Sequence, residues 1–227
     1  DPYAYKEPLY RTGVAVGDYP VDHHHFRHPD WRELPDLEFY PIPSFNVPMG
    51  TMIPKEVDDL IVAEKSISVS NLMNGATRLQ PVVMQLGQAA GALAALACIE
   101  DKGVKEIGVR QVQEKLLEAG CYIMPYLDLP KSDPHFKALQ RIGATGVLRG
   151  EGRNVGWSNE TWFRADEPLR GEEIYASEFY GAISVEPGEI SVGRMLEHVR
   201  SYGGRVPYGK LSDWWNQLGL NDFNAER

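Results

Sequence analysis

The chain has 227 residues, of which 43% are hydrophobic and 24% charged, and its formal net charge is −9. This composition is typical of a globular protein with a substantial core in one or two domains. The negative charge argues against a broad nucleic-acid interface, which needs a basic face. Two cysteines, Cys98 and Cys121, are too few for a disulfide framework, and we expect both to be small buried hydrophobic residues.

Proline punctuates the chain up to about residue 55, which forbids long helices and predicts extended segments and loops. The stretch FYPIPSFNVP, residues 39–48, can form at most an edge or irregular strand. The chain opens with DPYAYKEPLY, which has neither Met nor the apolar core of a signal peptide. We therefore expect a cut within, or a processed end of, a longer protein.

A nucleotide-binding half-unit is predicted around residues 60–81. The apolar run Leu60–Ala63 has charge on both sides, which suits a fully buried strand of a parallel sheet. The loop NLMNGAT follows, and then a helix begins with Pro81 in its first turn. A buried strand, a loop and a helix N-terminus facing the strand's carboxyl end make half of a nucleotide-binding unit.

The helix over residues 81–102 is the strongest helix signal, with Gly103 as its expected end. Gly87 and Gly91 in its interior each cost about 1 kcal/mol against Ala, so we expect a close backbone approach by a sheet or another helix. Its apolar run, residues 82–99, has two Gln and is mostly Ala and Gly. That is too weakly hydrophobic for a membrane span, and a buried helix of a soluble protein is expected.

A module of short helices is predicted after Gly103. GVRQVQEKLLEAG is amphipathic with Gly120 as its end, and SDPHFKALQRIGATG starts at Asp133 as N-cap with Pro134 next. Residues 159–183 should add a short strand and a helix, and two more helices should begin after Ser191 and Ser212. We place a domain boundary near residue 102, which separates residues 1–102 from residues 103–227.

The usual phosphate-binding and catalytic motifs are missing from the sequence. GATGVLRG, residues 143–150, has the wrong spacing for G-x-G-x-x-G, and no P-loop, nucleophile elbow or paired-cysteine zinc motif occurs. On spacing alone there remains the half-unit with Arg78 at its helix N-terminus. The ordinary interpretation of Arg78 is a solvated or carboxylate-paired side chain.

Four of the six histidines lie in the seven-residue run DHHHFRH, residues 22–28. An internal, interrupted run is no purification tag. Three interpretations stay open: a metal site, surface or structural histidines, and one wall of a pocket. A metal needs three or four converging ligands, and Pro20 and Pro29 leave little room for a helix that would align His24 with His28, so we expect no metal site.

Two separated motifs carry a resemblance to a known family. LIVAEKSISVSNLMNGATRLQPVVMQLGQAAGALAALA, residues 60–97 with the lead-in IPKEVDD, resembles the C-terminal flavin-side segment of bacterial FAD-dependent oxidoreductases of the glutathione-reductase type. Some members carry the label "xanthan lyase". The family order is V-A-G-R, I-S, a loop ending in R-x-x-P, and G-Q-A-A-G in an alanine-rich helix. Upstream, GDYPVDHH resembles the family's Y-P-x-D-x-H, with Asp22 and His24 on the matching positions.

The resemblance implies an α/β fragment, made of the C-terminal strands and helix of an FAD-binding domain, followed by a small mostly α-helical module. It also implies a pocket wall facing the flavin, with His24 as proton donor or acceptor to substrate, oriented by Asp22. The cofactor-binding residues that it implies are Glu64, Lys65, Gly75, Thr77, Arg78 and Gln80. The substrate would be a small molecule or a carbohydrate.

The sequence departs from the family in two ways. V-A-G-R is VAEK, so Glu64 and Lys65 replace Gly and Arg, and Glu adds bulk and a carboxylate where Gly permits a close approach. The G-x-G-x-x-G loop that holds the FAD pyrophosphate is not in the chain. We therefore expect the C-terminal fragment of a flavoenzyme, inactive and weak in FAD binding by itself, whose partner is the missing N-terminal FAD-binding half of the same protein.

The helical module has a weaker resemblance to one S-layer-homology repeat, over residues 133–180. The matching positions of its F-R-P-D-E-P-L segment are Phe163, Arg164, Asp166, Glu167, Pro168 and Leu169. The T-R-A-E positions read Arg170–Glu173 instead, so the capping Thr and the wall-contacting Arg are lost. Since such proteins usually carry three repeats, a structural addition that packs on the flavin domain is favoured over a cell-wall anchor.

Three functions follow from these patterns. The first is an FAD-dependent oxidoreductase with an unknown substrate near Asp22 and His24. The second is a polysaccharide lyase that uses His24 and a tyrosine such as Tyr19 as acid and base. The third is a noncatalytic surface-attachment protein. The compartment stays open, with a periplasmic or secreted location among the options.

Overall fold

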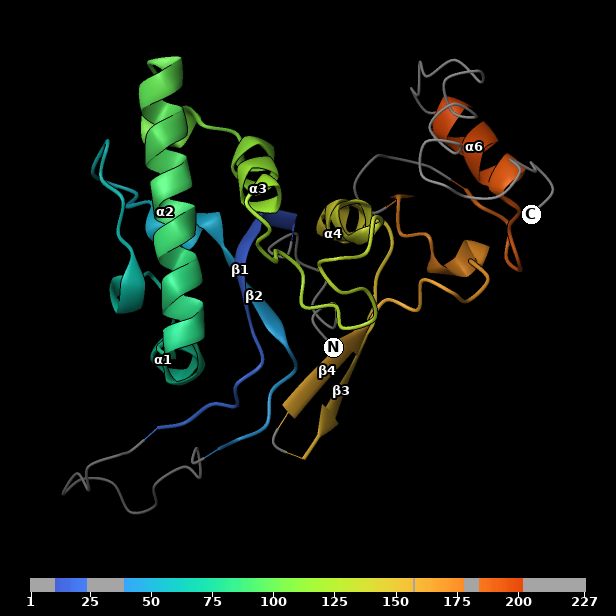
Figure 1. Cartoon of the computed structure of the whole chain (residues 1–227), viewed down its shortest axis with the longest axis horizontal. Helices are drawn as coiled ribbons and strands as arrows, with labels where there is room; N and C mark the ends of the chain where they lie inside the picture. The colour runs from blue at the N-terminus through green and yellow to red at the C-terminus, as the bar shows by residue number, and fades with distance from the viewer. Residues whose placement is uncertain (1–10, 24–38, 157, 178–183, 202–227) are drawn as a thin grey trace.

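The structure is a computed structural model that describes residues 11–23, 39–156, 158–177 and 184–201 (Figure 1). Its regular elements, apart from short 3-10 turns, are β1 (Gly13–Gly17), β2 (Phe45–Pro48), α1 (Asn71–Thr77), α2 (Gln80–Glu100), α3 (Val109–Glu118), α4 (Phe136–Thr145), β3 (Glu151–Val155), β4 (Ser158–Trp162) and α6 (Val192–Ser201). Helices and strands together make a small α/β fold, in which α2 stands beside the β1–β2 pair and α3.

Strands β1 and β2 pair antiparallel, from Gly13 opposite Pro48 to Gly17 opposite Phe45. The edge strand expected within residues 39–48 is therefore confirmed as β2. A Cβ on Gly17 would come within 2.5 Å of the Phe45 ring and 2.9 Å of Val82 on α2. Glycine at this position lets the strand pair lie directly against the first turns of α2.

The strand predicted at Leu60–Ala63 is wrong. These residues form no strand, Leu60 is 45% exposed, and the Val62 amide donates one hydrogen bond to the Met52 carbonyl at 2.8 Å. The two sheets among the described residues are both antiparallel pairs, β1 with β2 and β3 with β4. A strand needs a neighbour that pairs with its backbone groups, and an apolar run alone does not supply one.

Helix α2 runs from Gln80 to Glu100 with Pro81 in its first turn, as predicted. It ends differently, because Asp101 adopts the left-handed conformation (φ 51°) ahead of the expected Gly103. The helix buries seven residues along one face: Val82, Val83, Leu86, Ala89, Leu93, Leu96 and Ala97. The sequence pattern predicted a buried helix, and the structure shows one that is buried on one side.

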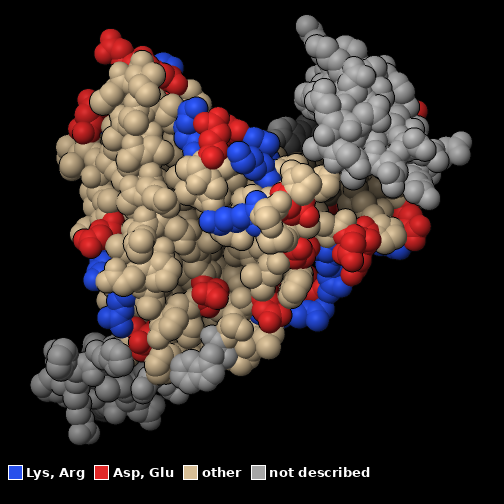
Figure 2. Space-filling view, in the orientation of Figure 1, with Lys and Arg blue, Asp and Glu red and all other residues tan. Residues whose placement is uncertain are grey.

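The other face of α2 is open along its length. Met84 is 70% exposed, Ile99 is 79% exposed, and a Cβ on Gly87 or Gly91 would meet nothing within 4 Å. The close backbone approach expected at the two glycines is therefore absent from the described part of the chain. Figure 2 shows a broad uncharged surface over this side of the molecule, with charged side chains along its edges.

By length and composition, α2 is the one helix of the described residues that could cross a membrane. Its 18-residue apolar window is 39% buried within the fold. The same test is passed by core helices of soluble proteins, and the buried face of α2 packs on β1 and α3. The expectation that the chain has no membrane span stays a prediction.

Helices α3 and α4 confirm the amphipathic helices predicted beyond residue 103, but α4 begins at Phe136 with His135 and not Asp133 as its N-cap. Each helix is followed by a glycine of positive φ, Gly120 (77°) and Gly146 (72°). Two buried glutamines tie them to the rest of the fold. Gln113 Nε2 donates to the Gly13 carbonyl at 2.8 Å, and Gln140 Oε1 accepts from the Met124 amide at 2.7 Å. A buried amide whose donor and acceptor are both used costs little and fixes its neighbours in register.

One hydrophobic core cluster contains residues from Val14 to Ala144, on both sides of the boundary placed near residue 102. That boundary stays a prediction. Helix α6 confirms the helix expected after Ser191, whose Oγ accepts from the Arg194 amide at 3.3 Å. The short strand expected in residues 159–183 is β4, whereas the end of that segment and the helix expected after Ser212 lie outside the described residues.

Candidate functional site

The GDYPVDHH segment begins at the end of β1, and its residues Asp22 and His23 lie against helix α1. Val21 forms a bridge with Tyr40, and Asp22 is 9% exposed. The His23 ring follows, with its Nε2 3.1 Å from the Leu72 carbonyl at the start of α1. His24, the expected proton donor or acceptor, lies outside the described residues. His23 is thus the histidine of the run that the structure places against the second motif.

Gly75 on α1 is where the two motifs touch. A Cβ at this position would lie 2.9 Å from His23 Nε2 and 3.0 Å from the Asp22 amide nitrogen. Both distances are shorter than ordinary carbon contacts, so a side chain at position 75 would clash with residues 22–23. These residues can pack on α1 because position 75 is a glycine. Gly75 is buried, and its role in the structure is to accept the upstream segment.

Arg78 and Asp22 make the second connection between the motifs. Arg78 Nη2 donates to the Asp22 backbone carbonyl at 2.8 Å and lies 3.8 Å from its carboxylate Oδ2. The Arg78 side chain is 38% exposed and the Asp22 side chain 12% exposed. This is the carboxylate-paired arrangement left open for Arg78, and it leaves more than a third of the cation facing outward.

Thr77 and Gln80 differ in what they present to solvent. Thr77 is 3% exposed, and its Oγ1 donates to the Met73 carbonyl at 3.0 Å, so the hydroxyl completes the last turn of α1. Gln80, the first residue of α2, is exposed. No side chain caps the α2 N-terminus, where the second residue, Pro81, has no N–H group.

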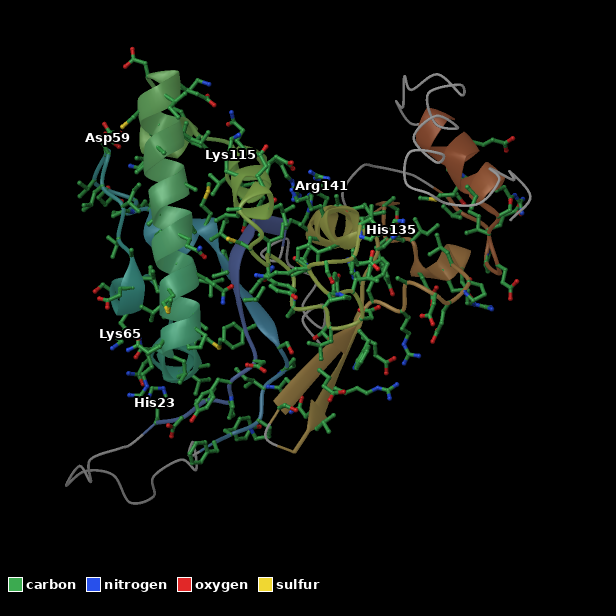
Figure 3. The ribbon with its side chains drawn as sticks, viewed as in Figure 1. His23, Asp59, Lys65, Lys115, His135 and Arg141 are labelled. Carbon is green, nitrogen blue, oxygen red and sulfur yellow. The ribbon has the colours of Figure 1, made fainter. Side chains whose placement is uncertain are left out.

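Glu64 and Lys65 occupy a short turn, Glu64–Ser66, that packs against α2. Both side chains are exposed. Glu64 has φ 65°, in the left-handed region that favours glycine. The family has glycine at this position, so the turn keeps a glycine-type backbone although the residue has changed. Figure 3 shows Lys65 and His23 toward the α1 end of α2.

Metal and thiol chemistry find no support in the described residues. These residues contain no group of three or more His, Cys, Asp or Glu that could hold a metal, whereas His24 and His28 lie outside them. Cys98 is exposed, contrary to expectation, and Cys121 is buried as expected. Burial raises the pKa of the Cys121 thiol, and its Sγ lies 3.4 Å from Gln88 Oε1, so the thiol form is favoured.

A mostly apolar pocket of about 470 Å³ lies beside this region, and the sequence pattern did not predict it. Its walls come from the end of β1, Ser44 just before β2, the first turns of α2, residues 122–130 and Asn159 on β4. No motif spans these five segments, which are more than a hundred residues apart at the extremes. Gln85, Tyr122 and Asn159 are the lining residues that sequence reasoning missed.

Comparison with known families gives one match. Residues 5–116 match the family described as FAD dependent oxidoreductase. The matched range contains both motifs and every site residue that the sequence predicted, but not the pocket residues from Tyr122 onward. This part of the chain is therefore similar to a family whose description names an oxidoreductase class and FAD as the cofactor. No curated protein and no solved structure matched the chain.

Proposed function

We propose that this chain is the flavin-side, C-terminal part of an FAD-dependent oxidoreductase of the glutathione-reductase type. One observation carries the proposal. Two motifs that are distant in the sequence and lie within one family match meet at Gly75 and Arg78, next to an uncapped helix N-terminus. Donor groups at a helix N-terminus suit a flavin ring that gains negative charge on reduction.

The exposed residues of the site fit such a cofactor in kind. The Lys65 ammonium, the Gln80 amide and the outward part of Arg78 supply donors, and Glu64 supplies a carboxylate for a ribityl hydroxyl. Gly75 and Thr77 have structural roles in this proposal. Gly75 lets residues 22–23 pack on α1, and the Thr77 hydroxyl donates a hydrogen bond within the last turn of α1. The flavin, when bound, would supply the electron-accepting ring system.

Asp22 and His24 are proposed to face the substrate, as the family resemblance suggests. The buried Asp22 accepts a hydrogen bond from Arg78 at its backbone carbonyl, and its backbone packs closely on Gly75 of α1. A carboxylate fixed in this way two residues before His24 is suited to orient the imidazole, which would hold or accept a proton of the substrate. Asp22 is therefore a positioning residue in this proposal.

The partner that we propose is an FAD-binding half of the same protein, which carries the G-x-G-x-x-G loop missing from these 227 residues. The open face of α2 supports this partner. From Gln80 to Ile99 the helix has no charged residue, and it leaves Met84, Gly87, Gly91 and Ile99 exposed. A continuous exposed apolar face rimmed by charges marks an interaction surface, and small residues admit a close backbone.

The test compares the complete protein with the 227-residue chain. We expect the complete protein to purify with the visible absorbance of flavin and the shorter chain to bind FAD weakly or not at all in a calorimetric titration. Tight FAD binding by the shorter chain would contradict the partner. Unsaturated sugar products formed without flavin reduction would favour the polysaccharide lyase, and a colourless complete protein that binds cell wall would favour surface attachment.

A matched pair of variants tests the α2 face. Gly91→Leu fills open space in the chain described here, so its melting temperature should not fall, whereas the complete protein should lose flavin. Glu118→Leu, at an exposed position on α3, should leave flavin retention unchanged. Equal flavin content in both variants would remove α2 from the interface.

A further inference from the structure

The 470 Å³ pocket lies within the volume range of small-molecule sites. Leu79, Pro81 and Val82 at the start of α2 form one wall, and Tyr122, Pro125 and Leu127 face them from the segment after α3. The pocket therefore adjoins the α2 N-terminus on one side and the second half of the chain on the other. A site of this kind exists only once both halves are folded together.

Three of the polar side chains in the pocket, Ser44, Gln85 and Asn159, already form hydrogen bonds with backbone groups. Gln85 Nε2 donates to the Val16 carbonyl at 3.0 Å while its Oε1 accepts from the Val16 amide at 2.9 Å. Ser44 Oγ donates to the Asn159 carbonyl at 3.0 Å, and Asn159 Nδ2 donates to the Asp18 carbonyl at 2.5 Å. A carbohydrate, which needs many converging hydrogen bonds, would find few partners that are not already in use.

The charge of the lining residues further limits the kind of ligand that the pocket would bind. Asp18, an exposed residue, is the only charged residue among those that line the pocket. An anionic ligand would therefore meet no lysine or arginine on the walls and one carboxylate at the rim. Two half-buried tyrosines, Tyr19 and Tyr122, contribute ring surface to the lining, and aromatic rings pack favourably on one another by edge or offset face. The Tyr122 ring also packs edge-on with Phe136, and the ammonium of Lys131, which is not a lining residue, lies 4.9 Å from its centroid.

We propose that this pocket binds a small molecule with an aromatic ring and no negative charge. The inference that this pocket is the substrate site of the oxidoreductase rests on the proposed function, because only the proposed FAD-binding half would place an electron acceptor near the α2 N-terminus. As a binding site it depends on the described residues alone. Of the two substrate classes that the sequence left open, a small molecule and a carbohydrate, this proposal favours a small molecule with an aromatic ring.

The experiment is a ligand-observed NMR titration of the 227-residue chain with three probes: benzyl alcohol, benzoate and methyl glucoside. Benzyl alcohol should bind, and the other two should bind at least about tenfold more weakly. Leu127→Trp, at a lining residue that is 53% exposed, should fill the pocket and remove benzyl alcohol binding. Tyr122→Ala should weaken it about tenfold.

The control is Tyr40→Ala, at a residue that is 54% exposed and outside the pocket lining, and its binding should equal that of the unchanged chain. Failure of benzyl alcohol to bind, tighter binding of the glucoside, or full binding by Leu127→Trp would each overturn the proposal. Flavin absorbance of the complete protein is measured separately. A flavin-containing protein whose chain binds no ring would retain the proposed function and lose this pocket.

Discussion

Arg78 and Asp22 lie 56 positions apart in the sequence, and the guanidinium Nη2 of one donates to the backbone carbonyl of the other at 2.8 Å. The same two residues face each other as charges, with 3.8 Å between Nη2 and Oδ2. The contact fastens the segment after β1 to the junction between α1 and α2. It makes Arg78 a structural residue whatever it contributes to a flavin.

Replacing Arg78 should therefore lower stability. We expect Arg78→Ala to cost about 1–2 kcal/mol, because Asp22 loses a charged donor while its carboxylate stays largely buried. Thermal or denaturant unfolding of the 227-residue chain measures the loss. Arg153→Ala, at an exposed arginine paired with Glu151, should change stability by less than about 0.5 kcal/mol. Equal losses in the two variants would contradict a special role for the Arg78 contact.

The same substitution in the complete protein tests the proposed flavin contact. We expect Arg78→Ala to lower the flavin reduction potential, because a fixed cation stabilises the negative charge that reduction builds up. Potentiometric titration with reference dyes measures it. An unchanged potential together with a lower melting temperature would leave Arg78 with the structural role alone.

Two glycine-to-alanine changes should have opposite effects. Gly75→Ala should destabilise the chain by about 1–3 kcal/mol, since its Cβ would press on the Asp22 backbone and the His23 ring. Gly87→Ala, on the open face of α2, should stabilise it by about 0.5–1 kcal/mol through helix propensity. Denaturant unfolding of both variants checks the signs. The double variant His23→Ala with Gly75→Ala should recover part of the loss, and no recovery would place the strain elsewhere.

Glycine at position 64 should stabilise the chain. Glu64 holds φ 65°, a conformation that costs a non-glycine residue about 1–2 kcal/mol, so Glu64→Gly should gain about 0.5–1 kcal/mol after the added flexibility of the unfolded chain is counted. Lys65→Gly is the control. Its φ is not positive, and glycine there should destabilise by about 0.5–1 kcal/mol. A loss of stability in Glu64→Gly would show that its carboxylate outweighs the backbone strain.

Glu172 gives an acid-sensitive contact near α6. Its carboxylate accepts from the Gly188 amide at 2.7 Å and from Arg170, and these bonds, the backbone one first, lower the pKa of Glu172 from 4.5 to about 2. Because the folded pKa is the lower one, the stabilisation is full above pH 4.5 and is lost as the pH falls through about 2. The Gly188 amide shift in NMR should titrate with that midpoint, and Glu172→Gln should abolish the step. A midpoint near 4.5 would contradict the contact.

Local patterns determined much of the fold. The helical periods, the early proline in α2 and the glycine after α3 predicted these helices, because backbone propensity and capping act within a few residues. The family resemblance, which depends on short motifs, agrees with the match of residues 5–116 to the family described as FAD dependent oxidoreductase. Helices, caps and short motifs depend on residues close together in the sequence, so the sequence alone is sufficient to predict them.

The tertiary structure decided what lies between distant segments. Leu60–Ala63 has the pattern of a buried strand but no paired neighbour in the described fold, and strand formation depends on that neighbour. The role of Gly75 in cofactor binding stays a prediction, and the structure adds that the His23 ring packs on this glycine. The pocket joins residues from Val16 to Asn159, which no local pattern connects. Contacts between distant segments arise from packing and hydrogen-bond satisfaction, and these become visible only when the whole chain is folded.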